Sequence, residues 1–204
     1  ENDTTPEVES RMVYTISSSG LRVLEKLAQA SRIGSLPLAY SSGWHETADR
    51  KAGVFETKWN EPEAWKETIL QGPHIGVGRP IAKQPNQGLK SHRDWTEVDL
   101  ESISPNFVPA VAFAITIPEL EYESRSYSYL GPKGRIKKGH SNSKQYVLAW
   151  RSMTNLTGSR TIISATYPPS TAHVHTVGSA IAELESDANS LLLAGTFMMS
   201  LLDD

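Results

Sequence analysis

Three charged residues in the first third of the chain have the types and rough spacing of a nuclease centre. Asp49 is followed by Glu56 and Lys58, which stand two positions apart on a segment that we predict to be a strand. In metal-dependent nucleases, carboxylates hold Mg²⁺ and a lysine orients the attacking water. The same pattern is common on exposed strands that do no chemistry, so a metal-dependent nuclease is kept as an alternative function.

Two histidines, His173 and His175, would share one face of a strand as metal ligands. No third ligand stands at a characteristic spacing, so packing or hydrogen bonding explains them as well. The glycine-rich run 72–78 lacks the Gly-Lys-Ser/Thr of a phosphate-binding loop, and the chain contains no Gly-x-Ser-x-Gly elbow. We therefore expect no metal site and no catalytic residue in this chain.

The charges are distributed unevenly along the chain. Residues 124–182 contain eight Lys and Arg and no Asp or Glu, although the whole chain has 20 Lys+Arg against 23 Asp+Glu. A local excess of cations of this kind is typical of a surface that binds a polyanion. The alternative is that these cations pair with acids of the flanking segments once the chain is folded.

A glycine-flanked basic loop, predicted over residues 130–142, lies at the centre of this segment. Its cations would follow a phosphate backbone, which anchors a protein on DNA without reading its sequence. Arg135, His140 and Asn142 offer donors and acceptors in defined geometry, so one or two of them would read bases in the major groove. The expected DNA-binding residues are Arg125, Lys133, Arg135, Lys137, Lys138, His140, Asn142, Lys144, Arg151 and Arg160.

The helices and strands that position these residues can be predicted from the sequence. Together they indicate an α+β domain with a mixed or mostly antiparallel sheet and helices near both ends. Apolar residues at helical spacing predict a helix after Ser17, and 180–202 is predicted to be the last helix. Arg151 and Arg160 border the last two predicted strands, so we expect them to support the sheet, with phosphate contact as a second role. Strands are predicted at 53–59, 107–117, 122–129, 146–153 and 161–167.

The composition excludes several classes of protein. Without Cys the chain has no disulfide, no Cys-ligated zinc or iron–sulfur cluster and no cysteine nucleophile, and this fits a cytoplasmic location. With 38% hydrophobic residues and five Trp it can bury a core, which excludes global disorder. The longest nearly apolar stretch, 191–202, is too short to span a bilayer, and the polar first ten residues are not a signal peptide.

Three stretches, in order, resemble one known family. They are WKETILQGPHIGVGRPIAKQPN at 65–86, SHRDWTEVDL at 91–100 and WRSMTNLTGSRTIISATYPPSTAHVHTVGS at 150–179. Together they resemble the C-terminal target-recognition region of large bacterial restriction–modification DNA methyltransferases of the adenine-specific, type IIG-like kind. In that family an Arg-Thr-hydrophobic run precedes Pro-Pro and a histidine-containing tail. The matching residues here are the run that begins at Arg160, then Pro168-Pro169, and then His173. Ser159 departs from the pattern, because a Glu usually precedes this arginine.

The resemblance implies a specificity domain that positions duplex DNA for a methyltransferase domain of the same parent chain, in phage defence, with or without endonuclease activity. It implies S-adenosylmethionine as a cofactor of the parent and no cofactor in this chain. The chain has no glycine-rich loop for that cofactor and no Asn/Asp-Pro-Pro-Tyr/Phe to hold a flipped adenine. Pro168 and Pro169 follow Tyr167 instead, so they do not serve that role.

The predicted organisation has three parts. Residues 1–16 are expected to be a terminal linker, 17–180 the recognition domain, and 181–204 a C-terminal helix cut from a larger protein. Because that helix is strongly apolar, a protein-interaction module that docks through it is kept as a further alternative.

Overall fold

The computed structural model describes residues 17–29, 36–91, 93–125, 127–131, 134–136, 145–153 and 162–199. The chain divides into two compact units, Glu1–Ser35 and Leu36–Asp204. The first unit contains α1 (Ser18–Ala28), and the Oγ of Ser17 accepts the backbone N–H of Gly20 at 3.3 Å. This bond satisfies one of the free N–H groups of the first turn, and it confirms the helix predicted after Ser17.

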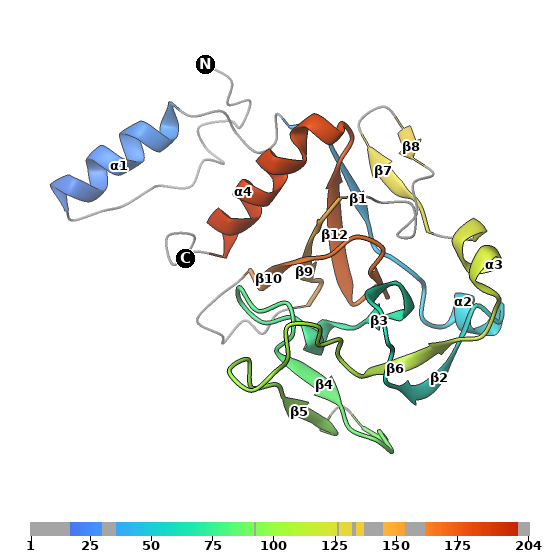
Figure 1. The fold of residues 1–204 in the computed structure, drawn as a ribbon. Coiled ribbons are helices and arrows are strands. Elements are labelled where there is room, and N and C mark those ends of the chain that lie inside the picture. The colour runs from blue at the N-terminus through green and yellow to red at the C-terminus, as the bar shows by residue number, and fades with distance from the viewer. Residues whose placement is uncertain are drawn as a thin grey trace. The chain divides into compact units, whose positions relative to one another are not determined.

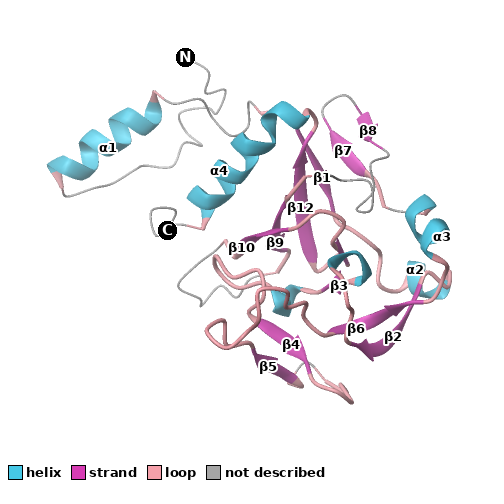
Figure 2. Cartoon of the chain, viewed as in Figure 1, coloured by secondary structure: helices cyan, strands magenta, loops and turns pink. Residues whose placement is uncertain are grey.

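The second unit is built around a six-stranded sheet in the order β10-β9-β12-β1-β7-β8 (Figures 1 and 2). Each neighbouring pair in it is antiparallel. Its strands are β1 (Leu38–Ser41), β7 (Tyr129–Gly131), β8 (Gly134–Ile136), β9 (Val147–Arg151), β10 (Ser164–Tyr167) and β12 (Val177–Ala182).

Smaller strand pairs and short helices complete this unit. The pairs β2–β6 and β4–β5 are antiparallel and β3–β11 is parallel, so the predicted α+β class with a mostly antiparallel sheet is confirmed. The strands are β2 (Phe55–Asn60), β3 (Ile69–Leu70), β4 (Lys83–Pro85), β5 (Trp95–Glu97), β6 (Val111–Ile115) and β11 (Ala172–His173). The helices are α2 (Ala48–Lys51), α3 (Glu119–Ser124) and α4 (Ala188–Met198), with 3-10 turns η3 (Trp65–Glu67), η4 (Gly72–His74) and η6 (Glu185–Asp187).

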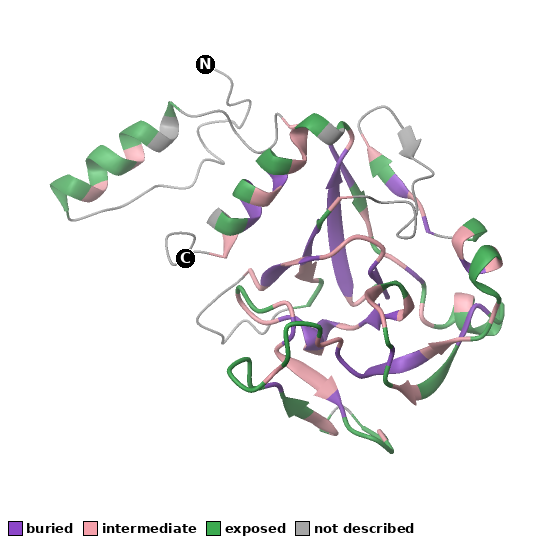
Figure 3. Cartoon of the chain, in the orientation of Figure 1, coloured by how far each residue is buried: buried purple, intermediate pink, exposed green. Residues whose placement is uncertain are grey.

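The core lies on both faces of the six-stranded sheet, and every residue of β12 is buried (Figure 3). On one face α4 packs against β9, β10 and β12 through the buried Leu191. A Cβ on Gly195 would lie 2.9 Å from Leu148 Cδ1, so the missing side chain lets the helix approach the sheet closely. On the other face Phe55, Phe113 and a cluster of aromatic side chains fill the interior.

The strand predicted at 122–129 is wrong, because its first part is helix α3. Pro118 precedes the helix, Glu119 and Glu121 stand in its first turn, and Glu121 pairs with Arg125 one turn later. Acids at a helix N-terminus and an i,i+4 ion pair both favour a helix. Tyr122 from this helix is buried in the core, whereas the strand β7 begins only at Tyr129.

The boundary predicted at residue 180 is also wrong, because it falls inside β12. The last helix begins at Ala188, not at 180, and it packs on the sheet of its own unit. One face of the helix is therefore used within its own unit, whereas Leu193 on the same helix remains 73% exposed. Among the described residues, no helix combines the length and the apolar character that crossing a membrane requires.

Candidate nucleic-acid interface

The acid-free segment 124–182 begins at the end of α3 and forms the hairpin β7–β8 at one edge of the six-stranded sheet (Figure 1). In this hairpin Leu130 pairs with Arg135 and Gly131 with Gly134. Part of the basic loop predicted at 130–142 is therefore a strand pair. β7 pairs with β1 on its other side, so the hairpin extends the main sheet.

The structure places three of the predicted DNA-binding residues. Arg125 follows α3, Arg135 is the central residue of β8 and Arg151 ends β9. The other predicted contacts lie outside the described residues: Lys133, Lys137, Lys138, His140, Asn142, Lys144 and Arg160.

Arg125 lies on the surface and is held by weak contacts. Its Nη2 lies 2.7 Å from Glu121 Oε1, and its Nη1 donates to the carbonyl of Ala52 at 3.5 Å. The two paired side chains are 45% and 41% exposed, so water screens the pair and its net contribution to stability is small. A phosphate group could therefore replace the carboxylate at little cost. The pair also agrees with the alternative in which flanking acids neutralise the segment.

Arg151 has a structural role. Its Nε donates to the carbonyl of Ile75 at 2.7 Å, which ties β9 to the loop after η4. Burial lowers the pKa of the guanidinium from its usual value, although it remains charged at neutral pH. We therefore assign this arginine to support of the sheet.

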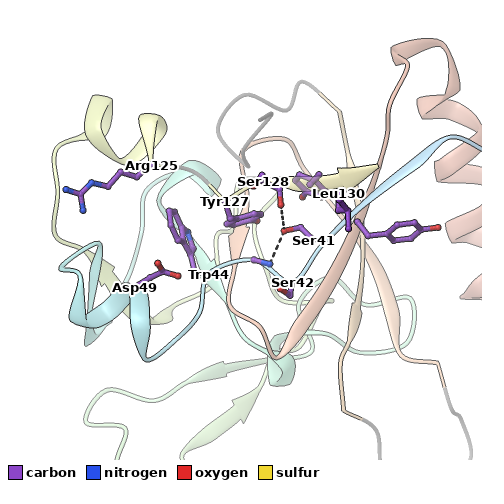
Figure 4. Close-up of a pocket in the computed structure, with 11 residues that line it drawn as sticks. Ser41, Ser42, Trp44, Asp49, Arg125, Tyr127, Ser128 and Leu130 are labelled. Atoms are coloured by element: carbon purple, nitrogen blue, oxygen red, sulfur yellow. Dashed lines mark hydrogen bonds between the residues drawn. The ribbon is translucent and has the colours of Figure 1, made fainter. Parts of the chain in front are cut away.

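A groove of about 560 Å³ opens beside the β7–β8 hairpin (Figure 4). One wall is the end of β1 and the turn that follows it, and the other wall is the segment 127–130. Asp49 and Arg125 lie together at one end of the groove, on the far side of Trp44 from Leu130 (Figure 4).

Hydrogen bonds and ring packing hold the walls of this groove. Ser41 Oγ donates to the carbonyl of Ser128 at 3.0 Å and accepts the N–H of Gly43 at 3.1 Å (Figure 4). The indole N–H of Trp44 donates to the hydroxyl of Tyr122 at 3.2 Å, and burial raises the pKa of that phenol. The groove is thus lined by aromatic side chains such as Trp44 and by the hydroxyl groups of serines such as Ser41.

The sequence analysis did not select Ser41, Trp44 or Ser128 as site residues. Their one local signal is the run Ser-Ser-Gly-Trp at 41–44, because Gly43 has a φ of +69° and makes the turn. The contact between Ser41 and Ser128 joins positions 87 residues apart, and no local pattern predicts it.

A buried polar network lies next to the groove. His173 Nδ1 donates to the carbonyl of Val174 at 3.2 Å, and its Nε2 lies 2.7 Å from Ser179 Oγ. The same Oγ lies 3.2 Å from the hydroxyl of Tyr129. Burial lowers the pKa of His173 to about 4, so the ring is neutral and both of its nitrogens are engaged. This histidine is a packing and hydrogen-bonding residue.

The prediction that His173 and His175 share one face of a strand is wrong. His173 is buried, whereas His175 is exposed after the end of β11 and stacks on His45, with ring centroids 5.3 Å apart. The Nδ1 of His175 accepts the N–H of Glu46 at 3.4 Å, and that of His45 accepts the N–H of Ala48 at 3.2 Å. The Nδ1 atoms of both rings are therefore engaged by backbone N–H groups of the segment 46–48.

Of the three residues of the nuclease alternative, Asp49 bonds to the backbone, and Glu56 and Lys58 pair with each other. Asp49 Oδ2 accepts the N–H of His45 at 2.6 Å, and Lys58 Nζ lies 3.8 Å from Glu56 Oε1 on the exposed face of β2. In the described part of the chain, no three or more His, Asp or Glu side chains are grouped so that they could hold a metal ion. No observation on the described residues therefore favours a metal-dependent nuclease over a DNA-binding domain.

In comparisons with known proteins, no family model, no curated protein and no solved structure matched this chain. The assignment of a function consequently depends on the residues and their arrangement.

Proposed function

We propose that the unit Leu36–Asp204 is a DNA-recognition domain that binds duplex DNA through the segment 124–182. The observation that carries this proposal is the absence of any acid from that segment, which contains eight Lys and Arg. The position of the β7–β8 hairpin at the edge of the sheet supports it, because an edge hairpin can project toward a duplex.

The residues divide into two roles in this proposal. Cations of the hairpin and of the residues after it neutralise phosphates, and Arg125 joins them by exchanging Glu121 for a phosphate. One or two of Arg135, His140 and Asn142 read base edges in the major groove. Arg151 supports the sheet through its bond to the carbonyl of Ile75.

The chain itself carries out no reaction in this proposal. The resemblance described above would place it beside a methyltransferase domain of a parent protein, and S-adenosylmethionine would bind to that domain. No residue of this chain is assigned to the cofactor.

The test is the binding of the chain to a mixed-sequence duplex across a salt series, measured by fluorescence anisotropy. The variant Lys133→Ala/Arg135→Ala/Lys137→Ala/Lys138→Ala removes four cations from the hairpin and the residues that follow it. If each contacts a phosphate, the slope of log K against log salt should become about 3 to 4 units less steep.

The matched control is Lys51→Ala/Lys58→Ala/Lys83→Ala/Lys90→Ala, which removes the same charge outside the segment. It should keep the wild-type slope, because these lysines are not assigned to phosphates. Equal slopes for the two quadruple variants, or no binding of the wild type at low salt, would contradict the proposal.

A further inference from the structure

The face of the six-stranded sheet that carries α4 is only partly covered. The helix covers β9, β10 and β12, but Tyr40 on β1 remains 49% exposed and Leu130 on β7 remains 63% exposed. Tyr40 pairs with Ala180 on one side and with Leu130 on the other. Since cross-strand partners point to the same face, the two exposed side chains lie next to each other.

A half-buried indole ring adjoins Tyr40. Trp150 pairs with Gly178, which is two residues from Ala180 on β12, so Trp150 lies on the same face as Tyr40. A Cβ on Gly178 would lie 2.6 Å from Trp150 Nε1, which shows that the indole lies directly across the glycine. The rings of Tyr40 and Trp150 meet edge to face, with centroids 6.3 Å apart and planes at 69°. We call Tyr40, Trp150 and Gly178 the aromatic shelf.

The row of paired residues that contains Tyr40 leads to the edge strand β8. Arg135 is the register partner of Leu130, so the row that runs through Ala180, Tyr40 and Leu130 ends at a cationic residue of the edge strand. The strand β8 leads directly into Lys137 and Lys138, within the acid-free segment. Tyr40 is exposed and Trp150 is half-buried beside it. Accessible aromatic rings on a sheet are typical of proteins that hold single nucleotides, because every base has a ring face that can stack.

We propose that the aromatic shelf stacks an unpaired base of the bound DNA. The inference rests on the proposed function, and it adds the kind of nucleotide that the domain takes. The base must be unpaired, since both faces of a paired base are covered by its neighbours within the duplex. The strands β7 and β9 belong to the acid-free, cationic segment 124–182, and a net positive segment favours a nucleic acid over an apolar protein segment as the occupant.

The experiment compares a fully paired duplex with the same duplex carrying one extra, unpaired 2-aminopurine nucleotide. The wild-type chain should bind the second duplex about fivefold or more tightly, and the emission of the 2-aminopurine should fall as it stacks. Tyr40→Leu should remove both the preference and the quenching. Tyr40→Phe should retain both, because stacking needs the ring and not the hydroxyl group.

The control is Tyr146→Leu, the same substitution at a tyrosine that is similarly exposed, 52% against 49%. Tyr146 stands four residues from Trp150, about 13 Å away along extended chain, so its loss should leave the preference unchanged. Far-ultraviolet circular dichroism and melting curves verify that each variant folds.

Each outcome decides between the two proposals. Binding to both duplexes with equal affinity, or a preference that survives Tyr40→Leu, overturns the aromatic shelf and leaves the DNA-recognition domain standing. Absence of binding to either duplex at low salt overturns both proposals.

Discussion

The interior around His173 and the edge of the sheet around the β7–β8 hairpin use polar groups in opposite ways. In the interior the polar groups are neutral and fully buried, and His173 and Ser179 bond to each other at 2.7 Å. Near the hairpin, Arg125 is charged and about half exposed, and its ion pair with Glu121 lies in water. The interior groups can serve only the fold, whereas the surface cation can exchange its partner for a ligand.

This difference follows from solvation. A buried polar group that loses its partner stays unsatisfied, so its hydrogen bonds fix the backbone around it. An exposed ion pair exchanges its partner for water at little cost, so it adds little to stability and remains open to a stronger anion. Stability should therefore respond strongly to changes in the interior and weakly to changes at the hairpin edge, while DNA binding should respond in the reverse order.

The largest effect on stability is expected from Gly43→Ala. The backbone at this position has a φ of +69°, and an added Cβ would lie 2.2 Å from the carbonyl oxygen of His173. That carbonyl cannot move away freely, because it accepts the N–H of Trp44 at 2.9 Å. We expect urea unfolding to show a loss of about 4 to 5 kcal/mol, the range of severe core defects.

Gly53→Ala is the matched control for this collision. Its φ is +73°, but an added Cβ would meet nothing within 4 Å. Only the backbone strain remains, so we expect a loss of about 1 to 2 kcal/mol. Equal losses at positions 43 and 53 would show that His173 does not hold the turn of the groove.

The second effect is a loss of stability in acid. Burial lowers the pKa of His74 and of His173 to about 4, from 6.5 in the unfolded chain. In His74 both nitrogens of the neutral ring are used, since Nδ1 accepts the N–H of Gln71 and Nε2 donates to the carbonyl of Ala110. Protonation is therefore favoured in the unfolded state between these two pKa values.

The stabilisation by the two neutral histidines is complete above about pH 6.5 and is lost as the pH falls toward 4. At pH 5 each histidine should cost about 2 kcal/mol relative to neutral pH. Urea unfolding at pH 7.5 and 5.0 measures the sum, and His173→Gln should remove about half of it. A free energy of unfolding that is the same at both pH values would contradict the buried, neutral state of these rings.

The smallest effect on stability is expected from Glu121→Gln at the edge. The substitution removes an exposed i,i+4 ion pair, so the free energy of unfolding should change by less than about 0.5 kcal/mol. Duplex DNA should nevertheless bind more tightly at low salt, because Arg125 is released and one negative charge is lost. Glu101→Gln, which removes an exposed acid outside α3, is the control for the charge alone. If the two variants bind DNA equally, Arg125 does not contact a phosphate.

The sequence correctly predicted those helices and strands whose formation depends on residues close together along the chain. The helix α1 follows from a serine cap and apolar spacing. Runs of β-forming residues predicted the strands as well: β2 overlaps the strand predicted at 53–59, and β6, β9 and β10 lie within their predicted strands. The helix α3 has a local signal as well, in Pro118 and the acids that follow it, but the tyrosines around Arg125 favour a strand, and this wrong prediction covered the helix. β12 had no such signal: it is buried on both faces, so neither alternation nor helical spacing marks it.

By itself, the sequence determined the α+β class, the acid-free cationic segment and the absence of cysteine chemistry, because these depend on composition and on neighbours along the chain. Only the tertiary structure decided that His173 is neutral and buried, that Ser41 reaches Ser128, and that an indole crosses Gly178 toward Tyr40. The contacts of Ser41 with Ser128 and of Trp150 with Gly178 join residues that are distant in sequence, and the burial of His173 depends on elements packed around it. Their formation depends on register and burial, which arise only when the whole core packs.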